Sequence, residues 1–286
     1  MTQHNAPSTP GFEIWTAYFE ANLARHDRLD ALIPWDSVSP LPPEDLAAIA
    51  RSLQRFELGE SGDGRGLLSK ARGRNDHGYD WALRLFVTEE QKHSALFRAA
   101  LLRFGTEPLS AHWTDGAFVA LRRMLGLRTE VTLFLIVETV AMEYFAALSR
   151  CADPVVQGVA RRILTDEVEH VRFQIDQLRL GFEDTPRPGR LLAASAAWML
   201  ALGTATVLAI DHGSALRACG LSPAVFWHRA LRHFGRALPL AFRLNGEAAS
   251  FGPSVQPSSD RLGRVGRVPA RVPALAHVAA VQAAPV

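Results

Sequence analysis

The sequence is poor in cysteine, in secretory signals and in the alternating patterns of β-strands. Its 286 residues contain two cysteines, Cys151 and Cys219. Two cysteines are too few for a disulfide framework in a chain of this length, so we expect a cytoplasmic protein in a reducing compartment. The N-terminal residues have no basic stretch followed by an apolar one, so no secretory signal is predicted.

The sequence also lacks an excess of charge of one sign. It holds 31 Lys and Arg residues against 29 Asp and Glu residues, a net charge of +2. The last 37 residues contain four Arg and one Asp, which leaves the rest of the chain at about −1. Proteins that bind nucleic acid depend on a basic surface, so this balance argues against a nucleic-acid partner. With 48% hydrophobic residues, a folded chain is expected.

One apolar run is long enough to cross a bilayer. Residues 191–210 are twenty positions without a charged side chain, which is the length of a transmembrane helix. Seven alanines dilute the run, and Arg190 and Asp211 bracket it. We therefore expect a buried core helix and no membrane partner.

Helical periodicity dominates the chain, and Pro, Gly and Asn/Asp clusters mark the breaks between helices. A short amphipathic helix is predicted over 11–29, followed by a proline-rich connector. Gly59, Gly62 and Gly64 weaken the first of the long helices, and Gly126 interrupts the third. The long helices are predicted over 43–71, 79–104, 116–151 and 153–181, and two more over 189–217 and 222–245. The predicted fold class is all-α.

Four long helices in succession predict a four-helix bundle with additional helices packed outside it. From Phe251 onward the sequence is aperiodic, which predicts a disordered tail. The expected domains are an N-terminal helix and connector over 1–42, a bundle over 43–181, C-terminal helices over 182–247 and the tail over 248–286.

Three of the predicted helices carry acidic or imidazole side chains on an otherwise apolar face. These are Glu90 and His93, Glu138, and Glu167 and His170. An unpaired buried carboxylate is costly enough to be neutralised, paired or bound to metal. Glu138 is the strongest case, because the residues before it are apolar nearly all round the helix.

The spacing of these residues suggests that the partner is a metal pair. Glu90–His93 and Glu167–His170 are both E-x-x-H motifs, and a further Glu stands 30 residues before the first and 29 before the second. The E-x-x-H spacing places a carboxylate and an imidazole one turn apart on the same helix face. The ordered set is a two-fold pseudo-repeat of Glu60, Glu90, His93, Glu138, Glu167 and His170.

Over residues 43–180 the chain therefore resembles the ferritin-like di-iron carboxylate superfamily. In that arrangement two helices give one Glu each and two give E-x-x-H. The resemblance implies two bound iron ions, with Mn/Fe or Mn/Mn as alternatives. It also implies that an acid before an E-x-x-H motif orients a metal-bound imidazole. Asp166 matches this pattern and is expected to orient His93. Glu89 stands at the same place before the first motif, as a longer side chain instead of Asp.

Other acidic and histidine positions are open to more than one interpretation. Glu57 lies one turn before Glu60, but the 30/29 spacing favours Glu60, so Glu57 is expected to be solvated or to support the ligands. Glu143 lies about 140° around the helix from Glu138 and is expected to be a surface or interface acid. His212 can line a substrate cavity, although a capping or core-edge role is the simpler interpretation. His26 has no partner at ligand spacing.

The function implied by the resemblance is a di-iron oxidase or oxygenase that activates dioxygen to oxidise a small organic molecule. The N-oxygenase branch has an additional His where this chain has Ile163, so amine N-oxygenation is not expected. Substrate and electron donor are not specified, and a homodimer is one possible assembly. The alternatives are a ferritin-type protein for iron storage or peroxide detoxification and a bundle that only mediates contacts.

Overall fold

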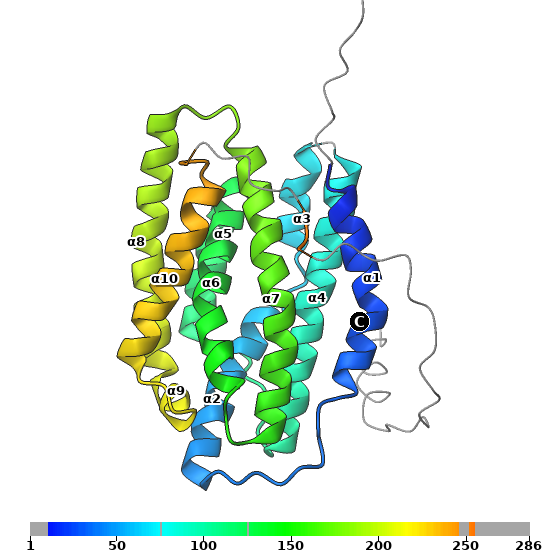
Figure 1. The fold of residues 1–286 in the computed structure, drawn as a ribbon, viewed down its shortest axis with the longest axis vertical. Helices are drawn as coiled ribbons and strands as arrows, with labels where there is room; N and C mark the ends of the chain where they lie inside the picture. Colours follow the sequence, from blue (N-terminus) through cyan, green and yellow to red (C-terminus); the bar gives the residue numbers. More distant parts are fainter. Residues whose placement is uncertain (1–10, 75, 125, 246–251, 255–286) are drawn as a thin grey trace, which may run out of the picture. The chain divides into compact units, whose positions relative to one another are not determined.

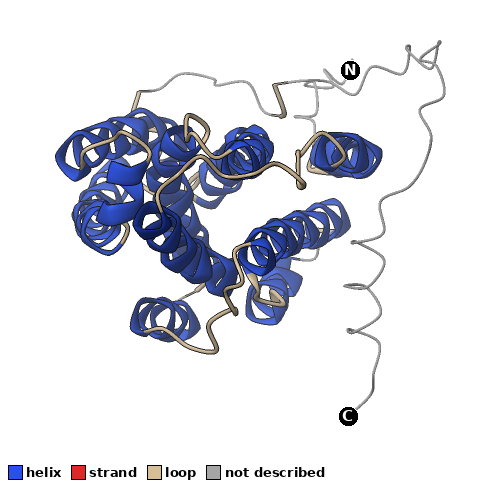
Figure 2. Cartoon of the chain, turned by 90° about the horizontal axis from the view of Figure 1, so that it is seen from below, coloured by secondary structure: helices blue, strands red, loops and turns tan. Residues whose placement is uncertain are grey.

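Every regular element in the described part of the chain is a helix. The computed structural model describes residues 11–74, 76–124, 126–245 and 252–254, and no strand occurs among them (Figure 2). The prediction of an all-α protein is therefore confirmed. The elements are α1 (Glu13–Asp30), α2 (Pro43–Glu60), α3 (Arg65–Ala71), the 3-10 turn η1 (Arg72–Arg74), α4 (His77–Arg103), α5 (Trp113–Met124), α6 (Leu127–Leu148), α7 (Pro154–Gly181), α8 (Arg187–Asp211), α9 (Gly213–Ala218) and α10 (Pro223–Ala241).

The ends of the long helices follow from local sequence signals. Asp76 caps α4 by accepting a hydrogen bond from the Tyr79 amide, 3.0 Å away. Asp153 caps α7 by accepting from two backbone amides at 2.9 Å. Proline occupies the first turn of α2, α7, α8 and α10, where its missing N–H costs nothing.

Three of the predicted helices are interrupted. The segment predicted over 43–71 divides into α2 and α3, and Gly64 at the break has φ = 65°. A Cβ there would lie 2.7 Å from Val87 Cγ2, so both the backbone conformation and the space favour glycine. The segment predicted over 116–151 divides into α5 and α6, and that over 189–217 divides into α8 and α9.

The helices that carry the predicted ligands lie together. α2 packs along α4, α6 packs along α7, and α4 also contacts α7 (Figure 1). α1 packs against α4 and α7, whereas α8 and α10 pack against α6. The four helices α2, α4, α6 and α7 therefore surround the interior, and α1 and the α8–α10 segment cover opposite sides of them.

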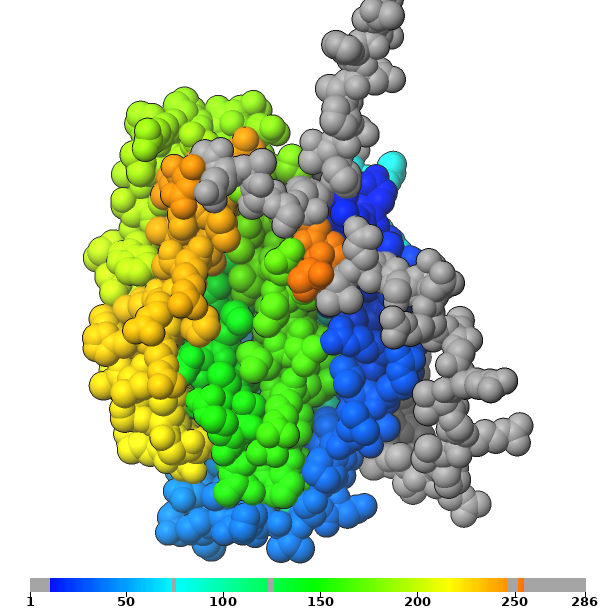
Figure 3. Space-filling model, viewed as in Figure 1, coloured from blue at the N-terminus to red at the C-terminus, as the bar shows by residue number. Residues whose placement is uncertain are grey.

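The prediction that residues 191–210 form a buried core helix is wrong. α8 lies at the surface, in yellow-green at the left of Figure 3, and Leu192, Met199 and Ile210 are 73%, 68% and 74% exposed. Small side chains allow a helix to approach its neighbours closely without burying its larger residues. The buried stripe of α8 consists of Ala194, Ala197, Ala201 and Ala205.

Two helices, α6 and α8, have the length and composition of a membrane span. They differ in burial: 78% of the apolar window of α6 is inside the protein, against 22% for α8. α6 is the central helix of the bundle, so its apolar character is explained by the core. The apolar surface of α8 borders the cavity described below.

Most of the segment predicted as a disordered tail, 248–286, lies outside the described residues. The described part, residues 252–254, binds to α7. The Gly252 amide donates to Asp176 Oδ2 at 2.8 Å, and the Ser254 amide donates to Glu169 Oε2 at 3.0 Å. These three residues therefore satisfy two buried carboxylates of the bundle.

Candidate metal centre

Four of the predicted ligands meet between α4 and α7. Glu90 and His93 come from α4, and Glu167 and His170 come from α7. One nitrogen or oxygen atom from each lies within 4.8 Å of the others. Both imidazoles are fully buried. Carboxylate oxygens and imidazole nitrogens in such a group form a ligand set suited to iron, manganese or zinc.

The Nε2 atom of each imidazole contacts an acid of the other helix. Nε2 of His93 lies 3.0 Å from Asp166 Oδ2, and Nε2 of His170 lies 2.9 Å from Glu89 Oε2. An ionised carboxylate only accepts, so Nε2 carries a proton in both histidines. Nδ1 is therefore the ring nitrogen that faces the centre, and it would bind a metal after losing its own proton. The expected contact between Asp166 and His93 is present, and Glu89 serves His170 in the same way.

Glu60 and Glu138 flank this group from the other two helices. Both line the same cavity as Glu90 and Glu167. Glu60 shares a hydrogen bond with Glu90, and Glu138 accepts one from the Gln174 amide. All six residues predicted from the pseudo-repeat thus face one region of the interior, with four tightly grouped and two beside them.

Crowding of acids makes this region electrostatically unfavourable without a cation. Burial is the main reason that the pKa values of Glu60 and Glu138 lie well above the usual range. The neighbouring acids Glu90 and Glu167 raise both further. Burial also raises the pKa of Glu167, and the charge of Glu90 adds to it. A bound metal would favour the ionised form of these carboxyls.

The remaining groups of the centre form an internal ion pair. Burial would raise the pKa of Glu90, but the interaction with Glu60 and the nearby charges of both imidazoles lower it to about 2. Burial would lower the pKa of His93, yet the hydrogen bond to Asp166 and the nearby carboxylates of Glu167 and Glu90 raise it to about 9. The pKa of His170 is raised for similar reasons, against burial, by the charge of Glu90 and the hydrogen bond to Glu89.

Several buried atoms of the centre have no hydrogen-bond partner within the described residues. His170 Nδ1 and Glu90 Oε1 lie 2.8 Å apart, yet neither makes a hydrogen bond of acceptable geometry. Buried polar atoms are almost always satisfied, so such a group indicates a missing ligand. One cation or a pair of cations among them would satisfy the whole set, and the residues present therefore fit a metal site. The atoms are Glu90 Oε1, His93 Nδ1, Glu138 Oε2, Glu167 Oε2 and His170 Nδ1.

A histidine from α1 stands behind both supporting acids, and the sequence analysis missed it. Nε2 of His26 lies 3.4 Å from Glu89 Oε1 and 3.3 Å from Asp166 Oδ1. The Asn22 amide also donates to Glu89 Oε1, at 3.1 Å. Helical periodicity, and not a ligand spacing, could have revealed that His26 is buried. Asn22 and His26 continue the buried stripe that Trp15 begins on α1.

Cations neutralise this outer group. The Arg162 guanidinium binds Asp166 and also Asp30 Oδ1, the latter at 2.8 Å. Lys92 Nζ lies 3.2 Å from His26 Nδ1. Burial would raise the pKa of Asp166, but the nearby His26 ring, the hydrogen bond from His93 and the charge of Arg162 hold it far below its usual range. Asp166 is therefore ionised and paired without any metal.

Two other acids are buried. Glu57 is 1% exposed and binds Arg98, with the closest pair of atoms at 2.6 Å, so it is not solvated, which was one of its two expected roles. Glu143, expected to be a surface or interface acid, is buried at the interface with α10, 3.2 Å from Arg229. Their basic partners come from neighbouring helices, so spacing along one helix does not reveal them.

A cavity of about 430 Å³ opens onto the four carboxylates. Its walls come from α2, α5, α6 and α8, and are mostly apolar. His212 is among the lining residues and also occupies the C-cap of α8 and the N-cap of α9, so both interpretations of this residue agree with the structure. The aromatic residues of the wall are Phe56, Trp113, Phe118, Phe134 and Phe145.

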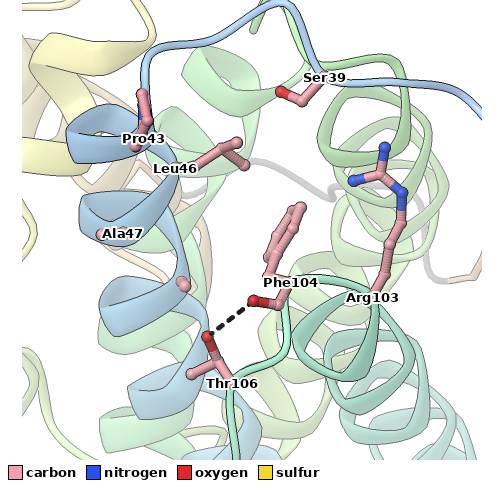
Figure 4. A pocket seen from close by; sticks show the side chains of 8 residues that line it. Ser39, Pro43, Leu46, Ala47, Arg103, Phe104 and Thr106 are labelled. Carbon is pink, nitrogen blue, oxygen red and sulfur yellow. Dashed lines mark hydrogen bonds between the residues drawn. The ribbon is translucent and has the colours of Figure 1, made fainter.

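A second hollow, of about 550 Å³, lies between the start of α2 and the end of α4 (Figure 4). Arg103 is the ionisable residue of its lining. The guanidinium of Arg103 already donates to the carbonyl oxygens of Trp35 and Ser37. Thr106 Oγ1 donates to the Phe104 carbonyl. This hollow holds no acid or imidazole among its lining residues, so we assign no chemistry to it.

Comparison of the chain with protein-family models, with curated proteins and with solved structures finds no match. The site is therefore interpreted from its own geometry.

Proposed function

We propose that this protein is a ferritin-like di-metal oxidase or oxygenase that uses dioxygen to oxidise a small organic substrate. The observation that carries the proposal is the apolar cavity of about 430 Å³ whose inner wall includes Glu60, Glu90, Glu138 and Glu167. A cavity that joins an apolar space to a cluster of ligands suits an organic molecule next to a metal centre.

The ferritin-like assignment rests on how the ligands are distributed over the helices. α2 and α4 pack as one pair, and α6 and α7 pack as another. Each pair contributes a single Glu from its first helix and an E-x-x-H motif from its second. This is the arrangement of ligands in di-iron carboxylate bundles.

Two iron ions, or a manganese–iron pair, bound by these residues would supply the binding and activation of dioxygen. The residues of the chain have separate tasks. Glu89 and Asp166 hold the Nε2 protons of the two histidines and so fix which nitrogen faces the centre. The apolar walls lower the polarity beside the carboxylates, which strengthens their interaction with a cation.

Iron storage or peroxide detoxification without an organic substrate is the alternative use of such a centre. The cavity favours an enzyme, because a storage site has no need of an apolar pocket beside the ligands. Iron capacity separates the two: an enzyme binds about two ions per chain, whereas a storage protein accumulates many more.

The test is reconstitution of the full chain with Fe(II) without air, followed by exposure to oxygen. Bound iron is counted first, and absorbance and oxygen consumption are then followed. Glu167→Gln should bind less iron and consume less oxygen than the parent. Glu143→Gln is the matched control, because Glu143 is equally buried but binds Arg229 away from the centre. Equal iron binding by the parent and Glu167→Gln would overturn the proposal.

A further inference from the structure

The cavity next to the carboxylates has a basic end. Arg55 lines it from α2, five residues before Glu60 and so about 7.5 Å away along the helix axis. His212, immediately after α8, lines it as well. Between this end and the carboxylates, the wall includes the side chains of Phe56 and Phe145. The cavity therefore presents a cation at one place and the proposed metal centre at another.

The Arg55 guanidinium is held in place by neutral groups. Nη1 donates to the Asp211 carbonyl at 2.6 Å, and Nε donates to His112 Nε2 at 3.3 Å. Nδ1 of His112 in turn lies 2.6 Å from Thr114 Oγ1. In the described part of the chain, no carboxylate oxygen lies within 4.0 Å of the guanidinium nitrogens. The charge of Arg55 is thus oriented but not paired, and its remaining N–H groups are available to a ligand.

His212 adds a neutral donor beside this cation. Its Nδ1 lies 2.6 Å from Ser52 Oγ, and the same oxygen lies 2.6 Å from the Tyr144 hydroxyl. All three groups are satisfied when Tyr144 donates to Ser52 and Ser52 donates to Nδ1, which leaves the ring proton on Nε2. Burial, together with the charge of Arg55, lowers the pKa of His212 to about 3, so the ring is neutral. Nε2–H has no partner among the described residues.

Besides the four carboxylates of the centre, the lining includes one further acid, Asp115. It is half-buried, and burial is the main cause of its raised pKa, opposed by Arg122 and His112. The basic groups that act on Asp115 are therefore Arg122 and His112, and Arg55 is not one of them. If Asp115 governed recognition, the cavity would select an amine rather than an acid, and this alternative is included in the test.

We propose that Arg55 and His212 bind the carboxylate of an apolar organic acid whose hydrocarbon part extends along the aromatic wall toward Glu60 and Glu138. The proposal rests on the proposed function and names the substrate class. One unpaired guanidinium and one neutral donor suit a singly charged carboxylate, which Arg binds through two parallel hydrogen bonds. A phosphate with two charges would require more cations than this end of the cavity offers.

The experiment measures binding to the full chain by calorimetric titration, with three probes that share one hydrocarbon tail. The probes are octanoate, its neutral amide octanamide, and octylamine. The variants are Arg55→Gln, Arg55→Lys and His212→Phe. Arg51→Gln is the control, because Arg51 lies one turn earlier on α2 and is exposed. Metal content is measured for every variant, and circular dichroism verifies that each is folded.

We expect the parent to bind octanoate more tightly than octanamide or octylamine. Arg55→Gln should weaken octanoate about 10- to 100-fold, the usual effect of losing a charge-assisted pair, and should leave octanamide unchanged. Arg55→Lys should recover part of the loss, His212→Phe should lose less than Arg55→Gln, and Arg51→Gln should match the parent.

Two results would overturn the proposal. One is a parent that binds octanoate no more tightly than octanamide, and the other is tighter binding of octylamine. The proposed function fails separately, through absence of metal or of oxygen consumption, whereas an effect of Arg55 on octanoate at unchanged metal content tests the acid site alone.

Discussion

Two neighbouring clusters of buried acids and histidines in this protein have opposite electrostatic states. The inner cluster consists of Glu90, His93, Glu167 and His170. The outer cluster consists of His26, Glu89 and Asp166. Buried atoms without a hydrogen-bond partner among the described residues occur in the inner cluster and also, at His26 Nε2 and Asp166 Oδ1, in the outer cluster. Both are buried and both have the residue types of a metal site. What separates them is the supply of positive charge from the chain.

The outer cluster is neutralised by the chain's own cations, because Arg162 binds Asp166 and Lys92 lies next to His26. The inner cluster has no Lys or Arg among its described contacts and depends on protons. The difference shows that ligand residue types alone do not define a metal site. A metal is expected where the buried anionic charge is left unmatched.

Removing the outer cation should have the largest effect on folding. Arg162→Ala leaves Asp166 and Asp30 without their guanidinium, and breaking a buried ion pair costs about 3–5 kcal/mol. The free energy of unfolding, measured with urea, should fall by that order. Arg161→Ala is the control, because Arg161 is exposed on the same helix. Equal stability of the two variants would show that the outer cluster does not need its cation.

Removing Glu138, an acid beside the inner cluster, should have the reverse effect in metal-free protein. Glu138→Gln eliminates a carboxyl whose pKa burial holds well above the usual range. The metal-free variant should therefore be as stable as the parent or more stable. It should, however, lose most of the stabilisation that metal gives the parent, which is about 3–4 kcal/mol at a metal concentration 100 to 1,000 times the Kd.

Thermal unfolding with and without Mn(II) measures both quantities for Glu138→Gln. Glu57→Gln is an informative comparison, because Glu57 is also buried but is paired with Arg98. Its loss should destabilise the protein without altering the response to metal. A parent that is not stabilised by Mn(II) would contradict the assignment of the inner cluster.

The smallest effect is expected where the two clusters meet. Asp166→Asn keeps the shape of the side chain but weakens its hold on the Nε2 proton of His93. Loss of such a supporting acid typically lowers metal affinity or activity about 10- to 100-fold. The variant should therefore still fill with Fe(II) at saturating supply, yet react with oxygen at a different rate. Identical iron affinity and oxygen kinetics would mean that Asp166 only forms an ion pair with Arg162 and does not support the metal site.

Much of the inner cluster could be predicted from the sequence, because its spacing is local. The E-x-x-H motifs and the preceding glutamates repeat at 30 and 29 residues, and helical geometry turns that repeat into one centre. The all-α fold follows from the same periodicity. Asp166 was predicted to contact His93 from its place before the motif.

The outer cluster and the position of α8 could not be predicted in this way. His26 reaches Glu89 and Asp166 from a helix more than sixty residues away in sequence, and Arg98 and Arg229 neutralise Glu57 and Glu143 across helix interfaces. Composition made α8 appear to be a core helix. Its alanine stripe, however, faces inward and leaves its larger side chains exposed.

The central claim is that the inner cluster is completed by metal, and metal content tests it most directly. The full chain is expressed without added metal, purified by gel filtration and analysed by plasma mass spectrometry beside Glu167→Ala and Glu143→Gln. We expect about two iron or manganese ions per chain in the parent and in Glu143→Gln, and a loss of both in Glu167→Ala. A parent that carries no more metal than Glu167→Ala, even after incubation with Fe(II) or Mn(II), would contradict the account.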